Sequence, residues 1–175
     1  MNIGYIGLGA MGGALARRLM LSRKMPVFDT RREIIDAFES EGAIGARDLP
    51  VLARESDVNF VCVPTSAVVR DVVFGQGSLA EGLAPGKIVV DQSTGDRTVT
   101  RKIAVELDKL GAALVAAPVS GGAVAGTIAI MCGGPERSLA VVRPILEAIS
   151  PSIVSCGDTG NGHVSRWRCL PSRTA

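Results

Sequence analysis

Residues 1–12 read Met-Asn-Ile-Gly-Tyr-Ile-Gly-Leu-Gly-Ala-Met-Gly, and this stretch decides the fold. A short apolar run ends in the pattern Gly7-x-Gly9-x-x-Gly12, and residues 14–21 carry apolar side chains at helical spacing. The order predicts a strand, a tight turn and a helix. Gly7 would allow the sharp turn, Gly9 would let backbone come close to a bound group, and Gly12 would let the helix pack tightly on the strand.

The context of the glycine turn indicates a dinucleotide site. The N–H groups and dipole of a helix start attract phosphate, and Asp29 follows about 20 residues on, at the end of a second apolar run. A carboxylate there accepts hydrogen bonds from ribose hydroxyls and repels a 2′-phosphate, which favours NAD over NADP as the cofactor. Arg31 and Arg32 could serve a phosphate instead, or could simply begin a solvated helix. The alternative to the whole interpretation is a glycine turn without a ligand.

Strand-like and helix-like segments alternate along the rest of the chain. Strands are predicted at 26–29, 42–44, 57–64, 87–91, 112–116, 128–132 and 152–155, and helices at 30–41, 49–55, 68–74, 98–110 and 135–149. A glycine-rich loop at 118–122 interrupts the pattern. The alternation predicts an α/β fold, a Rossmann-type, doubly wound and mostly parallel sheet in a single domain.

Composition narrows the class of protein. The 175 residues suffice for one domain, and a net charge of +2 with 3% aromatic residues argues against nucleic acid as a partner. No apolar run is long enough to span a membrane, and no secretory signal is recognised, so the expected location is cytoplasmic. The four cysteines form no C-x-x-C pair, so no metal site is expected; Cys62 and Cys132 lie in apolar runs and are expected to be buried.

Polar residues follow two of the predicted strands. Pro64 and Thr65 end one strand, and Ser93 and Thr94 follow another, on the side of the sheet where Gly9 lies. They would line a cofactor near its ribose and nicotinamide, although Ser93 and Thr94 could equally cap the next helix. The residues predicted to bind the cofactor are Gly7, Leu8, Gly9, Ala10, Met11, Gly12, Asp29, Pro64, Thr65, Ser93 and Thr94.

Four stretches, residues 6–13, 89–94, 117–127 and 131–134, together resemble the β-hydroxyacid dehydrogenase family. This family includes 3-hydroxyisobutyrate dehydrogenase and the cofactor domain of 6-phosphogluconate dehydrogenase. The resemblance implies NAD(P)-dependent hydride transfer between a small β-hydroxyacid and the nicotinamide, in a homo-oligomer. Ser120, Gly121 and Gly122 would form the substrate loop, where a hydroxyl and N–H groups hold a carboxylate; the alternative is a glycine hinge. An imine reductase or a 6-phosphogluconate dehydrogenase relative stays open, since one fold hosts several substrates.

The end of the chain departs from this family. Its members carry Gly-x-Gly-x-x-x-Lys, but Arg166 stands at the lysine position and Leu170 at that of an asparagine. A guanidinium stays charged and cannot pass on a proton, so no intact catalytic residue is predicted. Residues 1–164 are expected to form the domain, with 165–175 as an aberrant tail in place of a helical domain. A one-base deletion would explain the tail. The codons GTC AAG for Val-Lys, read one base late, become TCA AGG, which encodes the Ser-Arg seen at residues 165–166. The alternative function is a catalytically silent dinucleotide-binding fragment. His163 is expected to be structural or exposed.

Overall fold

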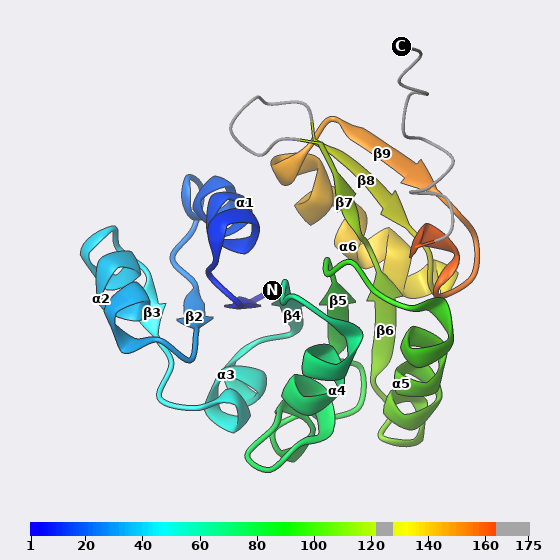
Figure 1. The fold of residues 1–175 in the computed structure, drawn as a ribbon, viewed down its shortest axis with the longest axis horizontal. Helices are drawn as coiled ribbons and strands as arrows, with labels where there is room; N and C mark the ends of the chain where they lie inside the picture. The colour runs from blue at the N-terminus through cyan, green and yellow to red at the C-terminus, as the bar shows by residue number, and fades with distance from the viewer. Residues whose placement is uncertain (122–127, 164–175) are drawn as a thin grey trace.

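The computed structural model describes residues 1–121 and 128–163. A six-stranded parallel sheet forms its centre, with strand order β3-β2-β1-β4-β5-β6 (Figure 1). The strands are β1 Ile3–Ile6, β2 Pro26–Phe28, β3 Ile44–Gly45, β4 Val58–Val61, β5 Ile88–Asp91 and β6 Ala113–Ala116. The chain builds outward from β1 in one direction and then from β4 in the other, so the order reverses between these two neighbours. This confirms the predicted doubly wound α/β fold.

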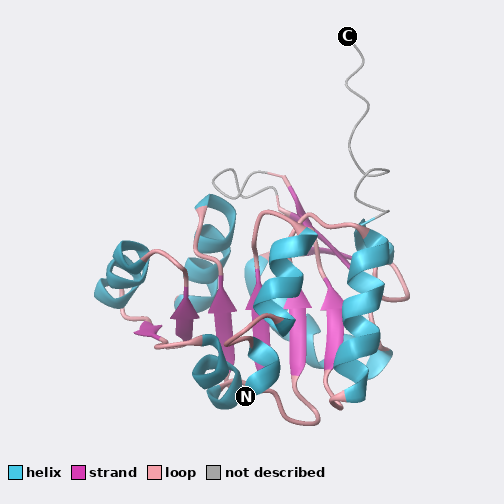
Figure 2. Ribbon diagram, turned by 60° about the horizontal axis from the view of Figure 1, so that its bottom comes forward, coloured by secondary structure: helices cyan, strands magenta, loops and turns pink. Residues whose placement is uncertain are grey.

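Helices cover both faces of this sheet (Figure 2). They are α1 Ala10–Met20, α2 Arg32–Ser40, α3 Leu49–Glu55, α4 Ser66–Phe74, α5 Arg97–Lys109 and α6 Glu136–Ile149, with a 3₁₀ turn, η1, at Leu79–Glu81. One hydrophobic core joins the sheet to α1, α2 and α6, and a second joins it to α3, α4 and α5. Because both faces are covered, the central strands β1, β4 and β5 are buried at every residue.

Helix starts follow from local chemistry. The Asp48 carboxylate accepts a hydrogen bond from the Val51 N–H of α3 (2.8 Å), and the Asp96 carboxylate accepts from the Val99 N–H of α5 (3.0 Å). The sequence predicts the helix after the glycine turn only from Ala14, because glycine is a poor helix former, and this predicted start is too late. In the structure α1 already begins at Ala10, and the Gly13 N–H donates to the Gly9 carbonyl at 2.7 Å.

The last strands form a separate sheet, which the sequence did not predict. Strand β7 Val119–Ser120 pairs antiparallel with β8 Ala129–Cys132, and β8 pairs in parallel with β9 Ser152–Ser155 (Figure 1). The predicted loop at 118–122 is therefore wrong for Val119 and Ser120. The apolar side chains of Val119 and Ile130, which face each other in register, are buried in the α1–α6 core, and this burial favours the strand.

Candidate functional site

A cavity of about 600 Å³ lies at the carboxyl end of the central sheet, where the strand order reverses. Doubly wound sheets bind their ligands at this position. Of the residues predicted from sequence, the cavity wall includes Gly7, Gly9, Ala10, Met11, Gly12, Asp29, Pro64, Ser93 and Thr94. The wall also includes several residues that the sequence did not single out for this site, among them Cys62, Val63, Gln92 and Val119.

The glycine turn has two tight positions and one open one. Gly7 has φ +87°, and a Cβ there would overlap the Cys62 carbonyl oxygen. A Cβ on Gly12 would overlap the Gly7 carbonyl oxygen. A Cβ on Gly9, by contrast, would meet nothing in the described part of the chain nearer than the Arg31 Nη2 at 4.0 Å. Gly7 and Gly12 are thus needed for packing, whereas Gly9 leaves space beside the start of α1, where N–H groups can approach an anion.

Asp29, directly after β2, is held by several donors. Its side chain is only 7% exposed. Its carboxylate accepts hydrogen bonds from the Leu8 N–H at 2.8 Å and from the N–H of Arg31 at 3.0 Å, and the Arg31 guanidinium pairs with it at 3.1 Å. Burial raises the pKa of Asp29, but these hydrogen bonds from Arg31 and Leu8 outweigh burial and leave the pKa below its usual value. The carboxylate is charged and faces the cavity with defined geometry.

The two arginines after Asp29 differ in their surroundings. Arg31 lines the cavity and pairs with Asp29. Arg32 lies outside the cavity wall, is 66% exposed, and pairs with Asp36 and Glu39 of its own helix. The solvated helix start therefore describes Arg32, whereas Arg31 shares the wall with Asp29.

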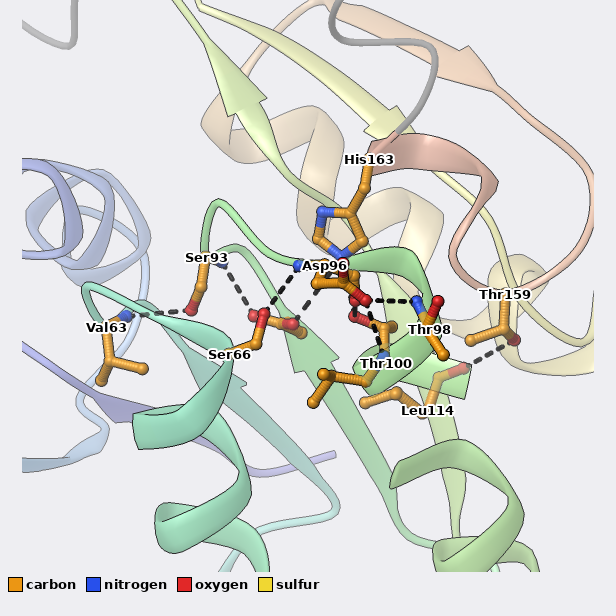
Figure 3. A network of polar contacts seen from close by, with 11 residues as sticks. Val63, Ser66, Ser93, Asp96, Thr98, Thr100, Leu114, Thr159 and His163 are labelled. Carbon is orange, nitrogen blue, oxygen red and sulfur yellow. Dashed lines mark hydrogen bonds and ion pairs between the residues drawn. The ribbon is translucent and has the colours of Figure 1, made fainter. Parts of the chain in front are cut away.

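The opposite wall is built by residues that follow β4 and β5, and Figure 3 shows two of them, Val63 and Ser93. The Ser93 hydroxyl accepts a hydrogen bond from the Val63 N–H at 3.0 Å, and the Ser93 N–H donates to the Asp91 carboxylate at 2.9 Å. Asp91 is buried, and this burial raises its pKa to about 6. The alternative in which Ser93 or Thr94 caps the next helix is wrong, because Asp96 is the N-cap residue of α5.

Gln92 lies between these residues and was missed by sequence reasoning. It is 1% exposed, and its Oε1 accepts a hydrogen bond from the Tyr5 hydroxyl at 2.7 Å. The Tyr5 ring stacks on Phe60 of β4 with 5.8 Å between centroids. Burial raises the pKa of the neighbouring Cys62 thiol to about 11, so it is protonated near neutral pH. Position was one available signal, since Gln92 and Cys62 directly follow buried strands, and Gln92 also lies in the stretch 89–94 that carries the family resemblance.

Some predicted residues lie off the cavity wall. Leu8 is buried in the core and contributes its backbone N–H to Asp29. Thr65 is the N-cap of α4, and its hydroxyl accepts from the Val68 N–H at 3.3 Å. Ser120 and Gly121 adjoin Val119, which lines the cavity, but are not themselves on the wall. Gly122 and Arg166 lie outside the described residues.

His163 is buried at 4% exposure beside the end of β5 (Figure 3). Its Nε2 lies 3.1 Å from the Thr100 hydroxyl of α5 and 3.9 Å from the Asp91 carboxylate. A Cβ on Gly95 would lie 3.3 Å from the imidazole ring. These contacts hold the segment around residues 160–163 against the start of α5. Cys132 is buried as expected, whereas Cys62 is half-buried and reaches the cavity.

The described part of the chain carries neither a candidate membrane-spanning helix nor a candidate metal-binding cluster. Within residues 1–121 and 128–163, no helix has the length and apolar character needed to cross a membrane. In the same part of the chain, no three His, Cys, Asp or Glu side chains gather as a possible metal site.

Comparison with known proteins identifies the family. Residues 2–157 match the family model described as the NAD binding domain of 6-phosphogluconate dehydrogenase, and the chain belongs to this family. It is 34% identical over 169 residues to a probable mitochondrial 3-hydroxyisobutyrate dehydrogenase of Dictyostelium discoideum, a match that covers 94% of this chain and 53% of the relative. It is 31% identical over 169 residues to 2-hydroxy-3-oxopropionate reductase of Escherichia coli, covering 95% and 58%. The resemblance to β-hydroxyacid dehydrogenases is thereby confirmed.

Solved structures give the same result. The structure of Mycobacterium tuberculosis 3-hydroxyisobutyrate dehydrogenase with L-serine superposes with a TM-score of 0.86 at 31% identity, covering 94% of this chain and 57% of that one. Psf3 in complex with NADP⁺ and 2-OPP superposes with a TM-score of 0.88 at 31% identity, covering 94% and 60%. The chain thus spans between half and three fifths of the length of these relatives. Its relatives are dehydrogenases and related oxidoreductases.

Proposed function

We propose that this chain is the dinucleotide-binding part of an NAD(P)-dependent oxidoreductase acting on a small β-hydroxyacid. The observation that carries the proposal is the open space at Gly9, between the start of α1 and the charged Asp29, inside a cavity at the switch point of the sheet. The cavity has the size of a ligand site. Residues 1–164 would form the binding domain.

The residues present fit a dinucleotide. The N–H groups at the start of α1 face space where a pyrophosphate could lie, and no acidic side chain occupies the first turn of this helix to repel it. The Asp29 carboxylate has lone pairs for the hydroxyls of the adenosine ribose. Gln92 carries a buried donor, Nε2, that has no partner within the structure. When bound, the nicotinamide would supply the hydride chemistry.

We propose NAD as the preferred cofactor. A 2′-phosphate on the ribose would meet the Asp29 carboxylate, which repels it and is not readily protonated because its pKa is low. Arg31 moderates this repulsion but is already paired with Asp29 at 3.1 Å. NADP therefore remains a weaker ligand rather than an excluded one.

We propose Ser120, Gly121 and Gly122 as the substrate loop, because Ser120 directly follows Val119 in β7 and Val119 lies on the cavity wall. Arg166 occupies the position of the proton-transferring lysine, and a guanidinium does not release its proton. Dinucleotide binding without appreciable turnover is therefore the second candidate. Homo-oligomeric assembly and a cytoplasmic location stay predictions.

Titration of the 175-residue chain with NADH and NADPH, followed by cofactor fluorescence, tests the binding proposal. Saturable binding with a lower Kd for NADH is the expected result, and absence of binding by a chain that circular dichroism shows to be folded would contradict it. A turnover assay with NAD⁺ and 3-hydroxyisobutyrate then separates the two candidates. Turnover clearly above the blank would support the enzyme, and binding without turnover would support the silent form.

A further inference from the structure

Gln92 has an unusual hydrogen-bonding state for a buried residue. Its Oε1 accepts from the Tyr5 hydroxyl at 2.7 Å, yet its Nε2 has no hydrogen-bond partner among residues 1–121 and 128–163 and is shielded from bulk water. Among the residues that line the cavity, no other side chain has a buried nitrogen or oxygen left unpaired in the described structure. An unpaired buried donor is costly, and native structures seldom keep one without a reason.

The Tyr5 hydroxyl determines how the Gln92 amide is oriented. Tyr5 is fully buried, and its ring is fixed by stacking on Phe60. Because the hydroxyl donates to Oε1, the oxygen side of the amide is occupied and the NH₂ side is the one left for another partner. A residue 87 positions earlier in the chain thus leaves the amide nitrogen of Gln92, a residue of the cavity wall, as the side of the amide that can still donate.

The position of Gln92 indicates which part of a ligand it meets. The strand order is β2-β1-β4-β5, so Asp29 after β2 and Gln92 after β5 lie on opposite sides of the glycine turn after β1. Three strand spacings separate them by about 14 Å. With the adenosine ribose at Asp29 and the pyrophosphate at the start of α1, the remaining half of a dinucleotide extends toward β5.

We propose that Gln92, oriented by Tyr5, donates a hydrogen bond from Nε2 to an acceptor oxygen on the nicotinamide half of the bound dinucleotide. The oxygen belongs either to the nicotinamide carboxamide or to the attached ribose. Tyr5 is a positioning residue that acts through Gln92. This inference rests on the dinucleotide binding proposed above and assigns a residue to the half of the ligand away from Asp29.

The test compares ligands that contain and lack this half. Kd values for NADH and ADP are measured by calorimetry on the wild-type chain, on Tyr5→Phe, and on Tyr5→Phe combined with Gln92→Met. Methionine has a similar shape but no donor, and the phenylalanine background avoids leaving the tyrosine hydroxyl unpaired. Relative to Tyr5→Phe, the double variant should bind NADH about three- to tenfold more weakly, with the Kd for ADP unchanged. ADP-ribose distinguishes the two oxygens, since it keeps the ribose and lacks the nicotinamide.

The Tyr5→Phe variant keeps the inference testable if the double variant does not fold. It retains Nε2 but releases Oε1, so NADH should bind about two- to threefold more weakly than to wild type, again with no change for ADP. Equal losses for NADH and ADP, or no loss for NADH, would overturn the role of Gln92 while leaving dinucleotide binding intact. Failure of the folded wild-type chain to bind either ligand would overturn the proposed function itself.

Discussion

Two aspartates at the carboxyl edge of the sheet have pKa values shifted in opposite directions. Asp29, after β2, is nearly buried but accepts hydrogen bonds from Leu8 and Arg31, and its pKa lies below the usual value. Asp91, at the end of β5, is fully buried, is hydrogen-bonded by the backbone and the side chain of Ser93, and has a pKa raised by burial to about 6. Donors outweigh burial at β2, and burial outweighs donors at β5.

This contrast shows how one sheet edge can serve two purposes. The β2 end presents a charge that is already well solvated by protein groups, as a hydrogen-bond acceptor for hydroxyls requires. At the β5 end the buried Asp91 contacts Ser93 and His163, and Figure 3 shows the last two residues. The glycine turn after β1 lies between these two ends, and three strand spacings of the sheet set their separation.

The largest effect on stability is expected from Gly7→Ala, which disturbs the glycine turn between the β2 end and the β5 end. Alanine at φ +87° is strained, and its Cβ would overlap the Cys62 carbonyl oxygen. We expect a loss of about 3–5 kcal/mol in the free energy of unfolding, measured by urea denaturation. Gly9→Ala is the matched control, because its Cβ has free space. It should change stability by less than about 1 kcal/mol but weaken NADH binding. Similar destabilisation by both variants would contradict this account of the turn.

The next largest effect is expected in the pH dependence of stability, through Asp91 at the end of β5. The pKa of Asp91 is about 6 in the folded protein and near 3.8 when unfolded. The folded state therefore binds the proton more tightly, and stability falls as pH rises from about 4 to about 6, by about 2–3 kcal/mol from this group. His163, 3.9 Å away, and the nearby Cys62 are the titratable groups facing it. A protonated His163 would favour the charged form of Asp91 and so reduce the loss of stability between pH 4 and pH 6.

Asp91→Asn should remove this part of the pH dependence while keeping an oxygen that accepts from the Ser93 N–H. The control is Asp108→Asn, at an exposed position of α5, which should leave the profile as in wild type. Urea unfolding between pH 4 and pH 7 provides the measurement. An Asp91→Asn profile that still falls as steeply as that of wild type would show that another group is responsible.

At the β2 end, Asp29→Asn tests the charged acceptor. An amide still accepts from the Leu8 N–H, but it no longer repels a 2′-phosphate and binds ribose hydroxyls more weakly. We expect about tenfold weaker NADH binding and a smaller or reversed preference over NADPH, measured by fluorescence titration. Asp36→Asn, 57% exposed in α2, is the control and should bind both cofactors as wild type does. An unchanged cofactor preference in Asp29→Asn would exclude Asp29 as its source.

The smallest effect distinguishes the two helix starts beside these ends. The α1 helix has no side-chain cap at Gly9, whereas the Asp96 carboxylate caps α5 through the Thr98 and Val99 N–H groups. Asp96→Ala should cost about 1 kcal/mol of stability, and Asp96→Asn should restore most of it because the amide oxygen can also cap. Urea midpoints measure both variants. If alanine and asparagine behave alike, the capping bond does not stabilise α5.

Local patterns in the sequence predicted much of the central fold. Alternating apolar segments predicted the strands and helices of the doubly wound sheet. The spacing from Gly7 to Asp29 predicted that both residues belong to one site, and both line the same cavity. The three-stranded sheet was missed because local hydrophobic periodicity does not indicate which distant residues pair, such as Val119 with Ile130. The Tyr5–Gln92 bond was missed for a similar reason. Tyr5 reads as one apolar strand residue among several, and its partner lies 87 positions away.

Dinucleotide binding at the glycine turn is tested most directly by titrating the folded 175-residue chain with NADH, on wild type and on Gly9→Ala in parallel. We expect saturable binding by wild type and clearly weaker binding by Gly9→Ala at nearly unchanged stability, because the added methyl group enters the space proposed for the pyrophosphate. Equal affinity of the two chains, or no binding by either while both remain folded, would contradict the assignment of the cavity to a dinucleotide.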